Sequence, residues 1–412
     1  MQIIDNSQNK AVGLIIAIMI SCFFIFDMTS ASSISVIMSI LVLFCVLIIQ
    51  THGKIPRTID QFHIRVFTFI VFCFLSSVWA WKSSLSIERG ITIFETLICM
   101  SVVFWLYQNS MSVDGLLHAI MWSGIIIFLY TISYYGAENF MTMSENMARL
   151  GNDFANSNAI GMWMAIVITV YVYYILNSKW KFQNIFVIFP VVLMAMSQSR
   201  TALIETLIGV AIIIVLQYWG KGDVLKGILS MLFAFSVVVV ILYFVSKLDV
   251  FEGISKRMLE YLTGTGKVGG SITQRAEYRE IGWNQFLRTP LLGIGIGNSY
   301  ELTALYAAHR TYLHNNFVEL LACGGAIGFI CYYSIHLYII KTLMSFRKYE
   351  SENTNTNICL AIIVMHLVSD WGTVSYYKKY TYVIFLLCFL HIHIVKRKWR
   401  EMRYEEENFV CK

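Results

Sequence analysis

Long apolar runs recur along the whole chain, separated by short polar intervals. A helix needs about 20 apolar residues to cross the roughly 30 Å hydrocarbon core of a membrane. The runs are continuous rather than alternating, which favours helices over the strands of a membrane barrel. The predicted spans are residues 11–29, 32–50, 64–82, 90–107, 113–135, 158–177, 184–199, 201–219, 226–246, 315–340, 358–375 and 380–395. We therefore predict an all-α polytopic protein with about 12 transmembrane helices, forming a single integral membrane domain over residues 1–412.

One polar interval, residues 248–313, is far longer than the others. The segment Ser271–Gln274 has the form of a capping box, which predicts the start of a helix there. Trp283, Phe286 and Leu287 then follow helical spacing, and the apolar face that they form suits the bilayer surface or the helix bundle. We expect a large loop that contains short helices and carries part of the functional site.

Composition and charge agree with a membrane protein and suggest its orientation. Charged residues make up 14% of the chain, whereas soluble proteins carry about 25%. With the N-terminus inside, the inner helix ends hold 17 lysines and arginines, and the short outer loops hold 5. This bias predicts cytoplasmic termini and an outward-facing loop 248–313. The basic residues sit at helix ends rather than in one stripe, so nucleic acid is not a predicted partner.

Three arginines are candidates for binding an anion. Arg275 and Arg279 lie one helical turn apart, and no acid stands three or four residues from either of them. The pair is either a solvated charged face or a site with an anion between the two guanidinium groups. Arg200 lies between two apolar spans, where it either snorkels to the headgroups or anchors a phosphate.

His314 is the candidate base, at the boundary between the long loop and the next span. A lone interfacial histidine is often a packing group, but a neutral imidazole can also take a proton from a sugar hydroxyl. His309 is a nearby competitor for this role. Asp370 is an acid that could orient the histidine, pair with an arginine, or simply face the interface.

Glycine and cysteine patterns carry no cofactor signal. Gly293, Gly295 and Gly297 lack the flanking strand and helix of a dinucleotide site, so we expect a tight turn in which backbones pack closely. The cysteines that lie in apolar runs show no metal-ligand spacing. We therefore predict neither a metal nor a cofactor.

Four motifs in order resemble those of the O-antigen ligase and polysaccharide polymerase superfamily of bacterial membrane glycosyltransferases. The resemblance covers residues 149–328. His314-Asn315, followed after nine residues by Gly325-Ala-Ile-Gly, is similar to the family's histidine motif. The other similar segments are Ser199-Arg200-Thr-Ala-Leu, Arg275 with Trp283 and Thr289-Pro-Leu-Leu-Gly-Ile-Gly, and Asn156-Ser-Asn158, in which serine replaces a proline.

The resemblance implies a metal-independent, inverting glycosyl transfer at the outer face of the bacterial inner membrane. The donor would be an undecaprenyl-diphosphate-linked oligosaccharide, and a glycan would be the acceptor. Arg200 and Arg275 would hold the diphosphate, and His314 would activate the acceptor hydroxyl. The further substrate-binding candidates are Arg279, Arg310, Arg149, Asn158, Asn315 and Asp370. A chain-length regulator and a flippase are the protein partners that the resemblance adds.

Two functions within the superfamily remain open at this point. A polymerase joins one lipid-linked repeat unit to another in O-antigen, capsule or exopolysaccharide synthesis. A ligase moves finished polymer to lipid A core or another acceptor. The polymerase is preferred because no additional acceptor-binding domain is evident. A transporter or flippase of lipid-linked sugars is the alternative outside the enzymes, and it would need no histidine.

Overall fold

The computed structural model describes residues 6–27, 32–54, 58–142, 150, 155–177, 182–219, 266–307, 309–347 and 354–410, with a few single positions between 225 and 236. Within these ranges every regular element is a helix, and there is no strand. The fold class predicted from the sequence is therefore confirmed.

The first half of the chain contains the bundle helices that precede the long loop. They are α1 (Asn6–Ile25), α2 (Ser32–Thr51), α3 (Gln61–Ser76), α4 (Ser83–Tyr107), α5 (Asp114–Tyr135), α6 (Ala137–Thr142), α7 (Ser157–Asn177), the 3-10 helix η1 (Phe182–Val187), α8 (Ile188–Met196) and α9 (Arg200–Trp219). The later elements are α12 (Gly266–Arg288), α13 (Ser299–Tyr306), α14 (Asn316–Arg347), α15 (Thr354–Ser369) and α16 (Lys379–Val410).

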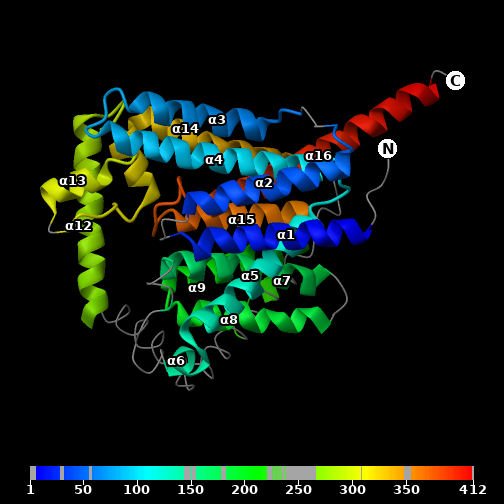
Figure 1. Cartoon of the computed structure of the whole chain (residues 1–412), viewed down its shortest axis with the longest axis horizontal. Coiled ribbons are helices and arrows are strands. Elements are labelled where there is room, and N and C mark those ends of the chain that lie inside the picture. Colours follow the sequence, from blue (N-terminus) through cyan, green and yellow to red (C-terminus); the bar gives the residue numbers. More distant parts are fainter. Residues whose placement is uncertain are drawn as a thin grey trace.

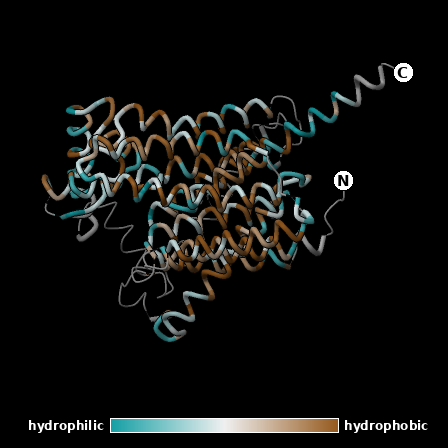
Figure 2. Tube along the Cα trace, turned by 45° about the horizontal axis from the view of Figure 1, so that its top comes forward, coloured by the Kyte–Doolittle hydropathy of each residue, from teal (hydrophilic) through white to brown (hydrophobic). Residues whose placement is uncertain are grey.

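The long helices run side by side, and the bundle has two distinct ends (Figure 1). At the end that we call the loop end, α12 lies across the bundle with α13 beside it. At the opposite end, called the terminal end, α1 begins and α16 projects beyond the other helices. Apolar residues dominate the middle of the bundle, and hydrophilic residues gather towards its ends (Figure 2). This distribution matches a hydrocarbon layer around the middle of the helices.

The described helices account for eleven of the twelve predicted spans. Seven of them are long and apolar enough to cross a membrane, and four shorter apolar helices correspond to further spans. The remaining span, 226–246, falls almost entirely outside the described residues. The predicted gap near Arg200 is present, because α8 ends at Met196 and α9 begins at Arg200. The chain is thus a multi-pass membrane protein, although a count of 12 spans is not established.

The helix in the long loop starts earlier than the sequence suggested. Helix α12 begins at Gly266, so Ser271 lies inside the helix and the capping-box prediction is wrong. The backbone stays helical through Gly269 and Gly270, which directly precede Ser271. Trp283 and Leu287 are exposed, so this face is not covered by the described helices and is free to meet the bilayer.

The glycine turn after α12 fastens the loop end to the bundle. Gly293, Gly295 and Gly297 all have positive φ, as a tight turn requires. A Cβ atom on Gly293 would lie 2.4 Å from the backbone of Cys323, so the close packing predicted from the sequence is confirmed. The Ile294 amide donates to the Ala322 carbonyl at 3.2 Å, which joins this turn to α14.

Helix α14 contains a break that sets the direction of its first turns. Gly325 has φ of 60° inside the helix. A Cβ atom on Gly325 would lie 2.3 Å from the carbonyl carbon of Leu291. The Ala326 and Ile327 amides instead donate to the carbonyl groups of Pro290 and Leu291. The residues between Asn316 and this break therefore form a short helical segment that begins directly after His314.

Candidate functional site

His314 lies in the linker between α13 and α14 at the loop end, in a strained backbone conformation. Its φ is 55°, in the left-handed region, which costs roughly 1–2 kcal/mol for a residue with a Cβ atom. The ring packs against Tyr312, with centroids 4.1 Å apart, and stacks on Tyr278 of α12 at 5.8 Å. Such strain persists only where surrounding contacts enforce it, as they do at many functional sites.

The contacts that enforce this conformation come from α14 itself. The buried carboxylate of Glu319 accepts a hydrogen bond from the Leu313 amide at 3.0 Å and another from the Ser299 hydroxyl at 2.5 Å. The Asn315 side-chain oxygen accepts from the Val318 amide at 3.0 Å and caps the helix. The backbone is therefore fixed on both sides of His314.

The surroundings of His314 leave it neutral and able to accept a proton. Burial, together with the charge of Arg275, lowers the pKa of His314 to about 4. Its Nδ1 atom is buried and makes no hydrogen bond to any residue that the structure describes. Burial lowers the pKa of Arg275 as well, and the charge of Arg279 contributes to the same shift. The structure thus brings His314, Arg275 and Arg279 into one electrostatic group.

Asp370, just after α15, supports the residues that follow His314. Its carboxylate accepts hydrogen bonds from Tyr333 at 2.8 Å, from Asn316 at 3.2 Å and from the Ser375 hydroxyl. Its carbonyl group accepts from the Asn316 amide at 2.7 Å. Burial raises the pKa of Asp370 to about 7. Its described partners are therefore neutral groups, rather than the histidine or the arginine considered from the sequence.

The residues that follow Arg200 and His314 in sequence both lie against the linker between α15 and α16. The Asn315 side-chain amide donates to the Trp371 carbonyl at 3.2 Å. A Cβ atom on the next residue, Gly372, would lie 3.3 Å from the Thr201 hydroxyl. Arg200 starts α9 immediately before Thr201. The linker therefore connects the surroundings of the two residues.

The remaining predicted residues have different settings. Arg310 is 55% exposed and pairs with Glu301 at 2.5 Å, so solvent and an acid already satisfy it. Asn158 lies in the first turn of α7, where its amide donates to the Asn156 side chain at 2.9 Å. Arg149 lies outside the described residues. The structure thus groups the arginines of α12 with the histidine, and leaves Arg310 on the surface.

A buried histidine pair lies next to Asp370, and sequence reasoning missed it. His336 of α14 and His366 of α15 approach at 3.1 Å between ring nitrogens, and His366 also contacts the Thr381 hydroxyl at 3.1 Å. With Asp370, their potential ligand atoms lie within 4.8 Å of one another. The residues come from separate helices, so no spacing in the sequence could reveal them. The hydrogen bonds from Tyr333, Asn316 and Ser375 already engage the carboxylate, which favours a polar network over a metal site.

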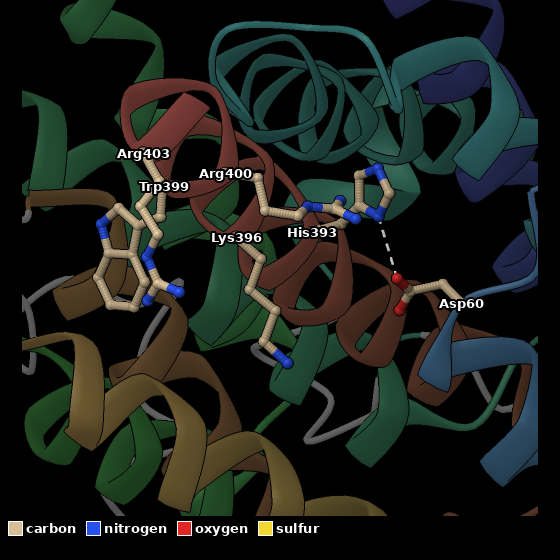
Figure 3. Close-up of a pocket in the computed structure, with 6 residues that line it drawn as sticks. All are labelled: Asp60, His393, Lys396, Trp399, Arg400 and Arg403. Carbon is tan, nitrogen blue, oxygen red and sulfur yellow. Dashed lines mark hydrogen bonds and ion pairs between the residues drawn. The ribbon is translucent and has the colours of Figure 1, made fainter. Parts of the chain in front are cut away.

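Two cavities contain clusters of cations, one at each end of the bundle. At the loop end, a cavity of about 440 Å³ is lined by Arg89, Lys378 and Lys379 together with Asn156 and Tyr312. At the terminal end, a cavity of about 350 Å³ lies beside α16. Its lining residues are Asp60, His393, Lys396, Trp399, Arg400 and Arg403 (Figure 3). Because Tyr312 packs on His314, only the first cavity belongs to the neighbourhood of the candidate base.

Comparison with known proteins agrees with the motifs in the central part of the chain. A family model described as O-Antigen ligase matches residues 185–333. The match includes Arg200, Arg275 and His314, and it confirms the resemblance to the O-antigen ligase and polymerase superfamily over that segment. Asn158 and Asp370 lie outside the matched residues. No curated protein matches the chain.

Proposed function

We propose that the protein is a membrane glycosyltransferase that moves a glycan from a lipid diphosphate to an acceptor hydroxyl. The observation that carries this proposal is the buried Nδ1 atom of His314, which has no hydrogen-bond partner in the described part of the chain and lies beside the Arg275 guanidinium group. A neutral imidazole next to a cation can accept a proton while a negative leaving group develops nearby. The family match over residues 185–333 supports the same class of enzyme.

In the proposed reaction, His314 takes the proton of the acceptor hydroxyl as its oxygen attacks the anomeric carbon. The bond between that carbon and the diphosphate oxygen breaks, and the diphosphate leaves with the bonding electron pair. Attack opposite to the leaving group inverts the anomeric configuration. Arg275 and Arg200 bind the diphosphate and stabilise its developing charge. These guanidinium groups supply the charge stabilisation, so the transfer that we propose is metal-independent.

We propose that the loop end faces outward from a bacterial inner membrane and that both termini are cytoplasmic. Two observations support this orientation. The inner helix ends hold 17 basic residues against 5 in the short outer loops. The beginning of α1 and the end of α16 also lie at the end of the bundle opposite to α12 and α13 (Figure 1). A reporter fused at residue 267 should therefore behave as extracytoplasmic, and cytoplasmic behaviour would overturn the orientation.

Among the functions of the superfamily, we propose the polymerase, with lipid-linked repeat units as both donor and acceptor. The second candidate is the ligase, which the description of the matching family model favours. Purified protein and lipid-linked repeat unit alone should produce a ladder of polymers. If glycan transfer occurred only after lipid A core was added, the ligase would replace the polymerase.

The histidine provides the test of the enzyme itself. His314→Ala should abolish the ladder, because the acceptor hydroxyl loses its base. His309→Ala is the matched control, because His309 is exposed in the same linker, and it should keep its activity. A full ladder from His314→Ala protein would eliminate the proposed base. No transfer by the wild-type protein to either acceptor would instead favour the transporter alternative.

A further inference from the structure

The cavity at the loop end is built from the starts of several helices. The first residues of α2, α7 and α16 meet there, together with the second turn of α4. Its volume of about 440 Å³ lies within the roughly 300–1,000 Å³ typical of small-molecule sites. Each helix N-terminus carries a partial positive charge. Three helix N-termini at one cavity favour the binding of an anion, if the side chains that line the cavity also carry positive charge.

Arg89 of α4 is the arginine that lines this cavity. Its side chain is only 17% exposed. The guanidinium group lies over the Tyr377 ring at 4.0 Å, and its nearest carboxylate is the exposed Glu88 at 3.7 Å. No hydrogen bond from Arg89 to any described residue is present. None of its nitrogens is both fully buried and without a partner, so its five N–H donors are open to an acceptor that enters the cavity.

Two lysines add positive charge to the same cavity. Lys378 pairs with Asp27 at 2.8 Å, so these two charges offset each other. The buried Lys379 ammonium group is held at 2.9 Å by the Ser32 carbonyl and at 2.6 Å by the Ser32 hydroxyl, which are both uncharged. The acids that line the cavity are Asp27, whose charge acts on both lysines, and the exposed Glu88 beside Arg89. Two acids therefore face three cations, and the cavity keeps a positive balance.

The distribution of charge along the chain points to the same cavity. The short outer loops hold only 5 lysines and arginines, because basic residues are disfavoured on that side. Three of these residues, Arg89, Lys378 and Lys379, line this one cavity although they are almost 290 positions apart in sequence. Their convergence is therefore a property of the fold, and a binding role accounts for it.

The cavity also reaches the candidate base. Tyr312 lines it and packs on the His314 ring at a centroid distance of 4.1 Å. The Tyr312 hydroxyl is hydrogen-bonded to the side chain of Asn156, another lining residue. An anion bound by Arg89 would consequently lie one aromatic ring away from His314.

We propose that this cavity extends the proposed diphosphate site beyond Arg200 and Arg275, and that it takes a phosphate group of a lipid-linked glycan. Arg89 would bind the phosphate oxygens through its planar fork, and Lys379 would add a point charge. The assignment rests on the proposed function for the identity of the lipid-linked substrate. The existence of the anion site rests only on the cavity.

Binding measurements test the site without requiring turnover. Undecaprenyl diphosphate is the phosphate probe, and a galacturonic acid oligomer is the carboxylate probe, each titrated into the purified full-length protein in detergent. Arg89→Gln should weaken binding of undecaprenyl diphosphate by about 10- to 100-fold, the range for hydrogen bonds to a charged group. Arg89→Lys should weaken it less, because it keeps the charge and loses the fork. Arg400→Gln, in the other cavity, is the matched control and should bind normally.

The possible outcomes distinguish failure of the anion site from failure of the proposed glycosyl transfer. If Arg89→Gln does not fold, Arg89→Lys decides, and unchanged binding by that variant would overturn the site. Equal binding of undecaprenyl diphosphate to wild-type and Arg89→Gln protein would also overturn it. If binding of the galacturonic acid oligomer depended on Arg89 and binding of undecaprenyl diphosphate did not, the assignment to a phosphate group would be overturned. Binding of undecaprenyl diphosphate that depends on Arg89 and persists in the His314→Ala variant supports the site. This holds even if the wild-type protein shows no glycosyl transfer.

Discussion

The two cation-containing cavities at opposite ends of the bundle differ in what already satisfies their charges. At the terminal end, Lys396, Arg400 and Arg403 line one cavity (Figure 3). All three are exposed, and Lys396 donates to the Tyr338 hydroxyl at 3.0 Å. At the loop end, Arg89 is largely buried and has no hydrogen-bond acceptor among the described residues. Water and lipid headgroups can serve exposed cations at little cost. A buried cation without an acceptor is therefore the stronger indication of a ligand.

The largest difference in turnover should appear between variants in which a histidine is replaced at the loop end and at the terminal end. His314→Gln should reduce turnover by about 10²- to 10⁴-fold, the usual contribution of a general base. His393→Gln, at the terminal end, should change it by less than about twofold, as a substitution away from the site. Polymer formation per folded protein is the measurement. Comparable losses in both variants would remove the functional distinction between the ends.

Two aspartates should give opposite pH dependence of stability. Burial raises the pKa of Asp370 to about 7, so the folded protein keeps a proton that the unfolded chain loses near pH 4. The free energy of unfolding therefore falls between about pH 4 and pH 7, by up to a few kcal/mol. Asp370→Asn should abolish this fall, measured as the thermal unfolding midpoint in detergent between pH 4.5 and 8. If the unfolding midpoint of the variant fell with pH as it does in the wild-type protein, Asp370 would not be the group responsible.

At the terminal end the sign is reversed. Burial would raise the pKa of Asp60, but the hydrogen bond and charge of His393 oppose this shift. Together with the Phe62 amide and the charge of His63, they lower the pKa of Asp60 below its ordinary value. Asp60 therefore stabilises the fold above the carboxyl pKa of the unfolded chain, near 4, and this contribution is lost as the pH falls through the folded value. Asp60→Asn should reduce the loss of stability in acid, and it should not alter the behaviour near neutral pH.

Glycines with positive φ should also distinguish the ends, with a smaller effect. Gly325→Ala would force a Cβ atom to 2.3 Å from the Leu291 backbone and should destabilise the protein by about 2–4 kcal/mol. Gly53, near the terminal end, has φ of 79° and open space around it. Gly53→Ala should cost only about 1 kcal/mol, from its backbone conformation. Thermal unfolding of both variants provides the measurement, and equal midpoints would show that the contact with Leu291 is not tight.

An exposed ion pair at the loop end should matter least. Arg310 pairs with Glu301 at 2.5 Å, but its side chain is 55% exposed. Arg310→Gln should therefore change stability by less than about 1 kcal/mol. Turnover should remain close to wild type if Arg310 does not bind substrate, and a large loss would restore the role predicted for it from the sequence.

Features that depend on local sequence were the most predictable. Apolar runs fixed the positions of most helices to within several residues, because a span must bury a continuous segment in lipid. The glycine turn at residues 293–297 followed from the conformational freedom of glycine. The start of α12 was predicted incorrectly, because a capping pattern at Ser271 also occurs within a helix that continues through the preceding glycines.

The cavity at the loop end could not be predicted from local patterns. Arg89 and Lys379 were counted only as outer charges, because nothing in the sequence indicates that α4 and α16 begin beside one cavity. The same limit applies to His336 and His366, which meet through the packing of α14 on α15. For Asp370 the sequence located an acid near the interface, but its hydrogen bonds to Tyr333 and Asn316 depend on the tertiary structure.

The short helical segment between His314 and Gly325 is anchored at both of its ends. One anchor is the pairing of Asn316 with Asp370, and the other is the pairing of Ala326 with Pro290. Inserting a single residue between them would rotate one anchor by about 100° and shift it by about 1.5 Å relative to the other. Insertions and deletions in this stretch should consequently be far less tolerated than conservative replacements of its side chains.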